Sequence, residues 1–142
     1  MKLRVALVVL ALLVAGVVAR WPRDSDVRAG QAALARAERA ADAHRRVVTP
    51  AELTDVQFDR LVVVHGTNTG EQVRKALGID WKRADDEADR CCEPPPIWAF
   101  MRGDEVVAYF RPSEAMGYGD DVRPGRYRPD AKLPIGRTYV RS

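Results

Sequence analysis

The most reactive side chains in this sequence are the thiols of two adjacent cysteines, Cys91 and Cys92. Neighbouring Cα atoms lie about 3.8 Å apart across a trans peptide, below the range of about 4.4–6.8 Å found in ordinary disulfides. A bridge between these two would therefore be strained and comparatively easy to reduce. Four interpretations stay open: a vicinal disulfide, an intermolecular bridge, metal binding, or two thiols without a chemical role.

Histidine is the second residue type to consider, because it serves both as a metal ligand and as a general base. The chain has two, His44 and His65, and both are distant in sequence from the cysteines. A thiol hydrolase could pair Cys91 or Cys92 with His65, although no nucleophile-elbow motif surrounds them. A thiol- or metal-dependent enzyme is thus an alternative. The leading expectation is a non-enzymatic protein without catalytic residues, metal or cofactor.

The segment 65–70 reads His-Gly-Thr-Asn-Thr-Gly and lies between a predicted strand and a predicted helix. Backbone N–H groups at such a position can bind an anion. The segment lacks both the Gly-Lys-Ser/Thr ending of a P-loop and the three-glycine spacing of a dinucleotide loop. A turn that caps the following helix is the favoured interpretation.

Tyrosine and arginine recur among glycines in residues 111–130. Tyrosines on such a loop offer large amphipathic contacts, and arginine binds anionic groups in a bidentate manner. The candidate binding residues are Tyr118, Arg123, Arg126, Tyr127 and Arg128. The expected partner is an envelope protein or an anionic polymer. A solvated loop is the alternative, because three aspartates in the same segment neutralise part of the positive charge.

Apart from His44, these residues belong to a predicted domain at 49–142. A helix should begin at Thr49, where Pro50 occupies the first turn and Glu52 reaches back to the cap. A buried strand is predicted over Phe58–Val64, since its last residues are apolar on both faces. Thr69 and Gln72 form a second capping box that opens a helix, and Gly78 ends it because a left-handed cap residue needs no Cβ.

The second half of this domain is predicted to add a hairpin. A polar loop, Lys82–Pro96, leads to strands Ile97–Met101 and Val106–Phe110, which a tight Arg-Gly-Asp-Glu turn connects. One more edge strand is expected near Lys132–Ile135 or Arg137–Val140. The predicted fold class is α+β: a small antiparallel sheet with one or two helices packed on one face, preceded by a membrane helix and a juxtamembrane helix.

The run from Phe58 to Phe110 resembles a family of small exported or membrane-anchored bacterial proteins with no assigned activity. The shared features are the strand, the Gly-Thr turn at Gly66, the helix that ends in Leu77-Gly78, and Trp81. Where the family tends to have Gly-Pro-Tyr-Thr, this chain has Gly-Thr-Asn-Thr. The resemblance implies a fold and an exported location, and it implies no catalytic residue.

The N-terminus carries the strongest localisation signal. Lys2 and Arg4 precede an uninterrupted apolar run, Val5–Ala19. As a helix this run would span roughly 22 Å, less than the hydrocarbon core of about 30 Å. Residues 1–21 are therefore predicted to be a signal-anchor, with Trp21 at the interface, or a signal peptide cleaved after Ala19. Both hypotheses place the C-terminal part outside the cytoplasm.

Residues 22–48 are predicted to form a helical stalk. Val27, Leu34, Ala41 and Val48 recur every seven residues, but the positions between them are small or polar. Such a thin stripe favours a solvated juxtamembrane helix, with a weak coiled coil as the alternative.

Length and charge complete the prediction. The chain has 142 residues and a formal net charge of +3, and its basic residues alternate with acidic ones, which argues against nucleic-acid binding. We expect a single-pass protein of the cytoplasmic membrane, anchored through residues 5–19, whose outer domain binds another envelope component. A secreted, inhibitor-like binding module is the alternative if the signal is cleaved.

Overall fold

An antiparallel sheet of four strands forms the centre of the protein, with the strand order β4-β3-β2-β5. The computed structural model describes residues 24–136. Along the chain the elements are α2 (Ser25–Asp42), β1 (Val47–Val48), α3 (Pro50–Leu53), β2 (Arg60–Val64), α4 (Gly70–Leu77), α5 (Ala84–Ala88), β3 (Ile97–Arg102), β4 (Glu105–Phe110), the 3-10 helix η2 (Glu114–Gly119), β5 (Gly125–Tyr127) and β6 (Leu133–Pro134). The predicted α+β class with an antiparallel sheet is confirmed.

The predicted hairpin is the β3–β4 pair. Arg102 lies opposite Glu105, so Gly103 and Asp104 form the turn, and Gly103 has the positive φ of 56° that favours glycine. On its other edge β3 pairs with β2, and Val62 of β2 lies opposite Ala99. Side chains on neighbouring strands alternate together between the two faces of the sheet, except at a register shift between Phe100 and Met101 in the β3–β4 pair.

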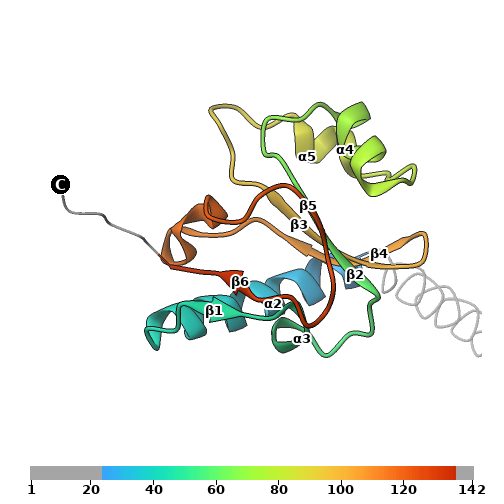
Figure 1. Ribbon diagram of the computed structural model, residues 1–142. Coiled ribbons are helices and arrows are strands. Elements are labelled where there is room, and N and C mark those ends of the chain that lie inside the picture. Colours follow the sequence, from blue (N-terminus) through green and yellow to red (C-terminus); the bar gives the residue numbers. More distant parts are fainter. Residues whose placement is uncertain (1–23, 137–142) are drawn as a thin grey trace, which may run out of the picture.

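Helices cover both faces of this sheet, which corrects the prediction that they pack on one face. Figure 1 shows α4 and α5 on one side and α2 on the other. On the first side, Val62 and Val64 pack with Val73, Leu77 and Trp81. A second part of the core lies on the α2 side and includes Ala33, Ala37, Leu61, Val63, Trp98 and Phe100. The physical reason is the apolar run of β2, which needs cover on both faces.

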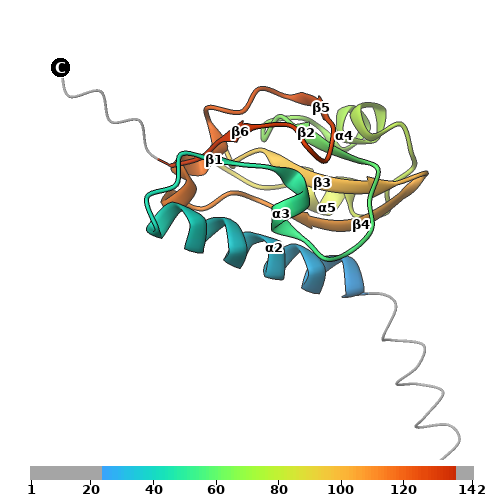
Figure 2. The ribbon, with the colours of Figure 1, turned by 60° about the horizontal axis from the view of Figure 1, so that its bottom comes forward.

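Helix α2 packs along the sheet, so the predicted solvated stalk is wrong for this segment. Ala33 and Ala37 are fully buried in the same core as Phe100, and Figure 2 shows the helix lying against the strands. At Gly30 the two backbones approach so closely that a Cβ atom would lie 1.6 Å from the carbonyl oxygen of Tyr109 in β4. Small residues allow this approach, and a stripe of them buries the helix without large apolar side chains.

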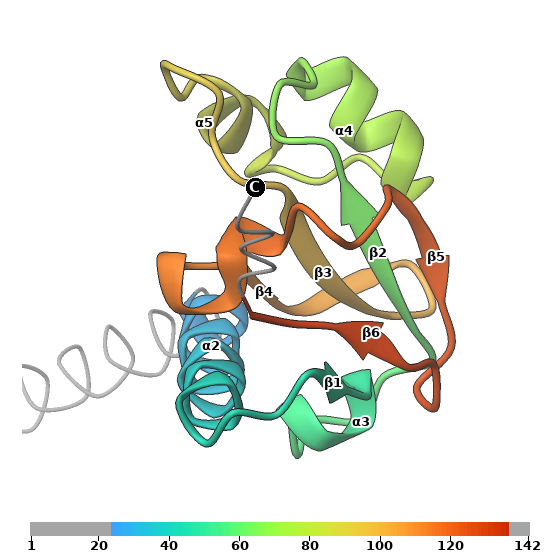
Figure 3. The ribbon, with the colours of Figure 1, turned by 60° about the vertical axis from the view of Figure 1, so that its left-hand side comes forward.

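The chain after β4 forms two short strands in two different sheets. β5 extends the main sheet as a neighbour of β2, where Tyr127 lies opposite Leu61. β6 pairs instead with β1, so that Val48 lies opposite Leu133, and Figure 3 shows this small second sheet beside the first. The predicted edge strand at 132–135 corresponds to β6, and the alternative at 137–140 lies outside the described residues.

The predicted membrane segment, residues 5–19, also lies outside the part of the chain that the structure describes. Between residues 24 and 136 no helix is both long enough and apolar enough to cross a membrane.

Candidate functional site

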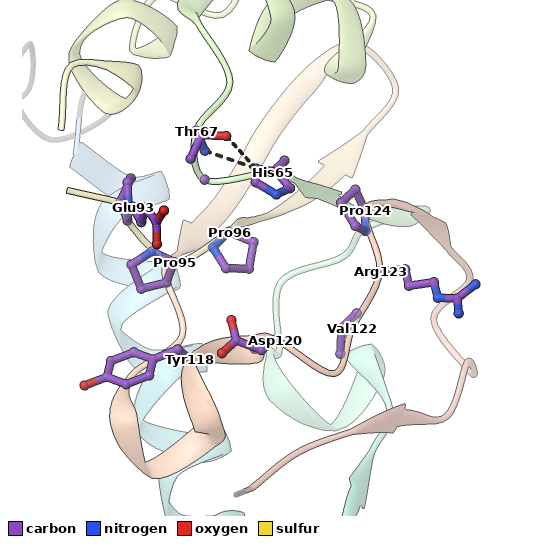
Figure 4. Close-up of a pocket in the computed structure, with 13 residues that line it drawn as sticks. His65, Thr67, Glu93, Pro95, Pro96, Tyr118, Asp120, Val122, Arg123 and Pro124 are labelled. Carbon is purple, nitrogen blue, oxygen red and sulfur yellow. Dashed lines mark hydrogen bonds between the residues drawn. The ribbon is translucent and has the colours of Figure 1, made fainter. Parts of the chain in front are cut away.

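A pocket with a volume of about 620 Å³ opens among three loops near one end of the main sheet. We call it the loop pocket. Its walls are residues 65–67 after β2, residues 93–96 before β3, and residues 118–120 and 122–124 around the end of η2. Figure 4 shows these segments around a common space, with the Arg123 side chain pointing away from it. A hollow of this size falls within the range of ligand-binding clefts, about 300–1,000 Å³.

His65 occupies the wall that follows β2. Its Nδ1 accepts a hydrogen bond from the backbone N–H of Thr67 at 3.2 Å and lies 2.8 Å from the Thr67 hydroxyl oxygen (Figure 4). Because the backbone group can only donate, the neutral imidazole carries its proton on Nε2. The Nε2 atom is then a donor that a ligand in the pocket could meet.

Gly66 joins this wall to the next one. A Cβ atom at this position would lie 1.8 Å from the carbonyl oxygen of Pro94, so the close approach of the two loops requires glycine. This second wall, residues 93–96, is also fixed from behind, because the Arg111 guanidinium donates hydrogen bonds to the carbonyl oxygens of Pro95 and Glu87. Residues 93–96 are therefore held on both sides.

Arg111 belongs to a partly buried ionic network. Its Nε lies 3.3 Å from a carboxylate oxygen of Glu87, whose other carboxylate oxygen accepts a hydrogen bond from the Tyr109 hydroxyl at 3.3 Å. Burial lowers the pKa of Arg111 below its ordinary value, against the opposing effect of Glu87. Burial, followed by the charge of Glu87, raises the pKa of Tyr109 to about 12. The network joins α5 and β4 to the pocket wall.

The rim of the pocket carries an aromatic side chain. Tyr118 is 44% exposed and has a φ of 56°, a conformation that costs free energy in any residue with a Cβ. The neighbouring Gly119 is buried, and a Cβ there would lie 2.7 Å from Pro112 and 3.3 Å from the indole nitrogen of Trp98. That nitrogen is buried and makes no hydrogen bond among the described residues. The tight turn therefore holds the tyrosine ring outward.

Acidic groups face the loop pocket more than basic ones do. In Figure 4 the carboxylates of Glu93 and Asp120 lie on the side bounded by the prolines and Tyr118, whereas the Arg123 guanidinium extends away from the other lining side chains. Prolines 94–96 and Val122 add apolar surface. The arrangement suits a ligand that combines an apolar part with hydrogen-bond donors or positive charge.

The structure distributes the five predicted binding residues over separate surfaces. Tyr118 and Arg123 line the loop pocket, and the Tyr127 hydroxyl donates a hydrogen bond to the Arg123 carbonyl oxygen at 2.5 Å. Arg126 and Tyr127 are consecutive in β5 and so face opposite sides of the sheet. Arg126 lies near Gly78 at the carboxyl end of α4, and Arg128 pairs with Asp130 at 3.1 Å. The segment 111–130 is thus a folded part of the protein and not a free loop.

The cysteines lie outside the pocket lining. Both Cys91 and Cys92 are exposed and free, and the hydrogen bond from Cys92 raises the pKa of the Cys91 thiol. A raised pKa keeps the thiol protonated and weakens it as a nucleophile. No group of three or more potential metal ligands gathers anywhere in residues 24–136.

The predicted capping residues are confirmed. Thr69 accepts a hydrogen bond from the backbone N–H of Gln72 at 3.3 Å, and the Gln72 side chain accepts one from the N–H of Thr69 at 2.8 Å. Gly78 ends α4 with a φ of 73°. Because the cap satisfies N–H groups at this helix start, the segment 65–70 acts as a capped turn that holds one wall of the pocket.

Sequence reasoning missed the pocket itself. It singled out His65, Tyr118 and Arg123 as separate features, and it treated the three prolines only as part of a polar loop. Comparison with known proteins adds no further guide, because no family model, curated protein or solved structure matches the chain.

Proposed function

We propose that this protein is a membrane-tethered, non-enzymatic binding domain on the outer side of the cytoplasmic membrane, and that its partner binds in the loop pocket. The observation that carries the binding role is the pocket of about 620 Å³ that three loops form around Tyr118 and His65. The support for the location is the basic and then apolar N-terminus, Lys2 to Ala19.

The chemistry of the pocket favours binding over covalent catalysis. Neither cysteine is among the residues that line it, and the raised pKa of Cys91 leaves that thiol in its less reactive form. The His65 Nδ1 is already an acceptor for Thr67, which leaves the ring suited to donating a hydrogen bond.

The pocket also indicates the class of partner. Tyr118 and the prolines provide apolar contact area, and the carboxylates of Glu93 and Asp120 can accept hydrogen bonds or pair with an amine. A segment of an envelope protein or polymer that carries amine, amide or hydroxyl donors fits these groups. An anionic polymer would meet the two carboxylates at this site.

Photocrosslinking in the native envelope tests the proposal. A photoreactive phenylalanine analogue at Tyr118 of the full-length chain should capture a partner, whereas the same probe at Val47 should not. Val47 is a matched control because it is 42% exposed, close to the 44% of Tyr118, and does not line the pocket.

A charge reversal sharpens this experiment. Asp120→Lys should abolish the capture at Tyr118, and Asp104→Lys, which reverses an exposed aspartate in the β3–β4 turn, should leave it unchanged. Equal capture by Tyr118 and Val47 probes, or equal loss in both lysine variants, would show that the loop pocket is not the site.

A further inference from the structure

The two adjacent thiols are placed for chemistry with each other. Cys91 and Cys92 are neighbours in the chain, and both are exposed and free. Both thiols are therefore open to a reagent in solution. A disulfide reagent can therefore react with one thiol, and the neighbouring thiol can then attack the mixed disulfide.

The backbone around the pair is in an unusual conformation. Cys92 has a φ of 69° and Glu93 a φ of 51°, two successive left-handed residues that are not glycine. Such conformations are sparsely populated and depend on their surroundings. A disulfide between neighbours closes a small ring that includes their peptide bond, with Cα atoms about 3.8 Å apart, closer than in ordinary disulfides. Closing this ring would therefore strain the backbone at this point.

The next residues carry that change into the loop pocket. Glu93 and Pro94 follow the thiols directly and line the pocket. The Pro94 carbonyl oxygen lies against Gly66, where no space for even a Cβ atom exists. One residue further along, Arg111 holds the Pro95 carbonyl oxygen. Because Pro95 is held by Arg111 and Pro94 lies against Gly66, a displacement that starts at Cys92 would press on Gly66, between His65 and Thr67.

We propose that Cys91 and Cys92 form a reversible thiol–disulfide site whose oxidation reshapes the loop pocket at His65. The oxidant is a disulfide RSSR. The Cys92 thiolate attacks it and forms a mixed disulfide, and the leaving thiolate takes up a proton and departs as one RSH. The second cysteine then attacks the mixed disulfide, closes the Cys91–Cys92 bond and releases the second RSH. Two hydrogens and two electrons pass from the cysteine pair to RSSR. The site acts whether or not a ligand occupies the pocket.

The test uses the full-length chain, purified in detergent micelles without a histidine tag and treated with glutathione disulfide or with a reducing dithiol. Tryptic cleavage after Arg90 and Arg102 leaves both cysteines on one peptide. In the oxidised sample this peptide should be lighter by two hydrogen atoms. A glutathione adduct or a crosslinked dimer without that peptide would overturn the proposal.

The two histidines report on the pocket. With histidine labelled at Cε1, the spectrum contains signals from His65, in the pocket, and from His44, which lies beyond the end of α2. A His44→Gln variant assigns them. Oxidation should shift the His65 signal and leave the His44 signal in place. The Cys91→Ser/Cys92→Ser variant, which loses only exposed side chains, should show no shift with either reagent.

Two results would refute the coupling. A bridge that forms while the His65 signal stays in place would show that the pocket does not respond to oxidation. The single Cys91→Ser variant can take up glutathione but cannot close the ring, so a shift of His65 in that variant equal to the wild-type shift would exclude the ring as its cause.

Discussion

Gly30 sets how closely α2 can approach the sheet. A Cβ atom here would lie 1.6 Å from the Tyr109 carbonyl oxygen, 2.5 Å from its carbonyl carbon and 2.9 Å from its nitrogen. All three atoms belong to the backbone of β4, so no side chain can rotate away. The helix would have to move as a whole, together with the buried Ala33 and Ala37.

Gly30→Ala should therefore destabilise the protein. In an unconstrained helix the same change gains roughly 0.5–1 kcal/mol, but overpacking a closely packed contact costs about 1–3 kcal/mol. We expect the free energy of unfolding in a denaturant titration to fall. Gln31→Ala, at an exposed position of the same helix, should change it by no more than about 0.5 kcal/mol. An increase in stability for Gly30→Ala would contradict the close approach.

Sequence reasoning succeeded at residues whose role is local. Thr69, Gln72 and Gly78 were recognisable because a cap involves neighbours in the chain, and Gly103 because a tight turn needs a positive φ. Gly30 gave no such signal. Its role depends on the backbone of Tyr109, which lies far away in sequence, and a glycine inside a helical pattern looks like a weakness of the helix.

At the scale of the element, both ends of α4 are set by specific capping residues. Its start is the Thr69 and Gln72 capping box, and its end is Gly78 with a φ of 73°. We expect Thr69→Ala to cost about 0.5–2 kcal/mol. Gly78→Val should cost at least about 1 kcal/mol, because a β-branched residue resists the left-handed conformation.

The midpoint of a denaturant titration measures both costs. Lys75→Ala, on the exposed face of the same helix, is the control and should leave the midpoint nearly unchanged. If the Thr69 and Gly78 variants both unfold at the wild-type midpoint, these residues do not set the ends of α4.

The contact between α5 and β4 predicts a response to alkaline pH. The folded protein raises the pKa of Tyr109 from its ordinary value of 10 to about 12. Because the folded state holds this proton more tightly than the unfolded state, the associated stability is fully present below pH 10 and is lost as the pH rises towards 12. Stability should therefore decline across this window.

Ultraviolet titration of the phenolates checks this expectation. The wild-type chain should show an ionisation step near pH 12 that Tyr109→Phe removes and that Tyr118→Phe, a change at an exposed tyrosine, retains. A titration curve that is the same for wild type and Tyr109→Phe would show that Tyr109 is not in the environment described.

Element assignments from sequence failed where an element is short or lacks an apolar pattern. β5 consists of Gly125, Arg126 and Tyr127, and nothing in these three residues distinguishes a strand from a loop. α5 lies in a segment rich in acidic residues and was expected to be a loop. Both elements are held by tertiary contacts, β5 by pairing with β2 and α5 by packing against α4, so local propensity does not reveal them.

At the scale of the whole molecule, the arrangement of layers could have been inferred more completely. Leu61 to Val64 are all buried, and a run that is apolar on both faces already requires cover on both. The second cover was not recognised because α2 presents alanines and a glycine to the sheet. A stripe of small residues gives only a weak amphipathic pattern in the sequence. In the fold the helix can nevertheless approach the sheet so closely that the stripe is fully buried.

Location is the remaining prediction for the whole protein. The full-length chain should fractionate with membranes, and protease added outside intact protoplasts should digest the domain, because Lys2 and Arg4 precede the apolar run 5–19. A cytosolic protein of similar size serves as the control for lysis. Recovery of the full-length chain in the cytosol would contradict the prediction, and a mature N-terminus at Arg20 would select the secreted alternative.

The docking of α2 has a mechanical consequence. The described chain enters the domain at Asp24, and Arg83 of the segment before α5 holds Asp26 in the first turn of α2 at 3.1 Å. Tension between this end of the chain and a ligand in the loop pocket would load the pairs of Arg83 with Asp24 and Asp26 first and the contact at Gly30 next. The hydrogen bonds between β2 and β3 would carry the force only after these contacts. The α2–β4 contact would thus be the first to yield, before the sheet that supports the pocket is disturbed.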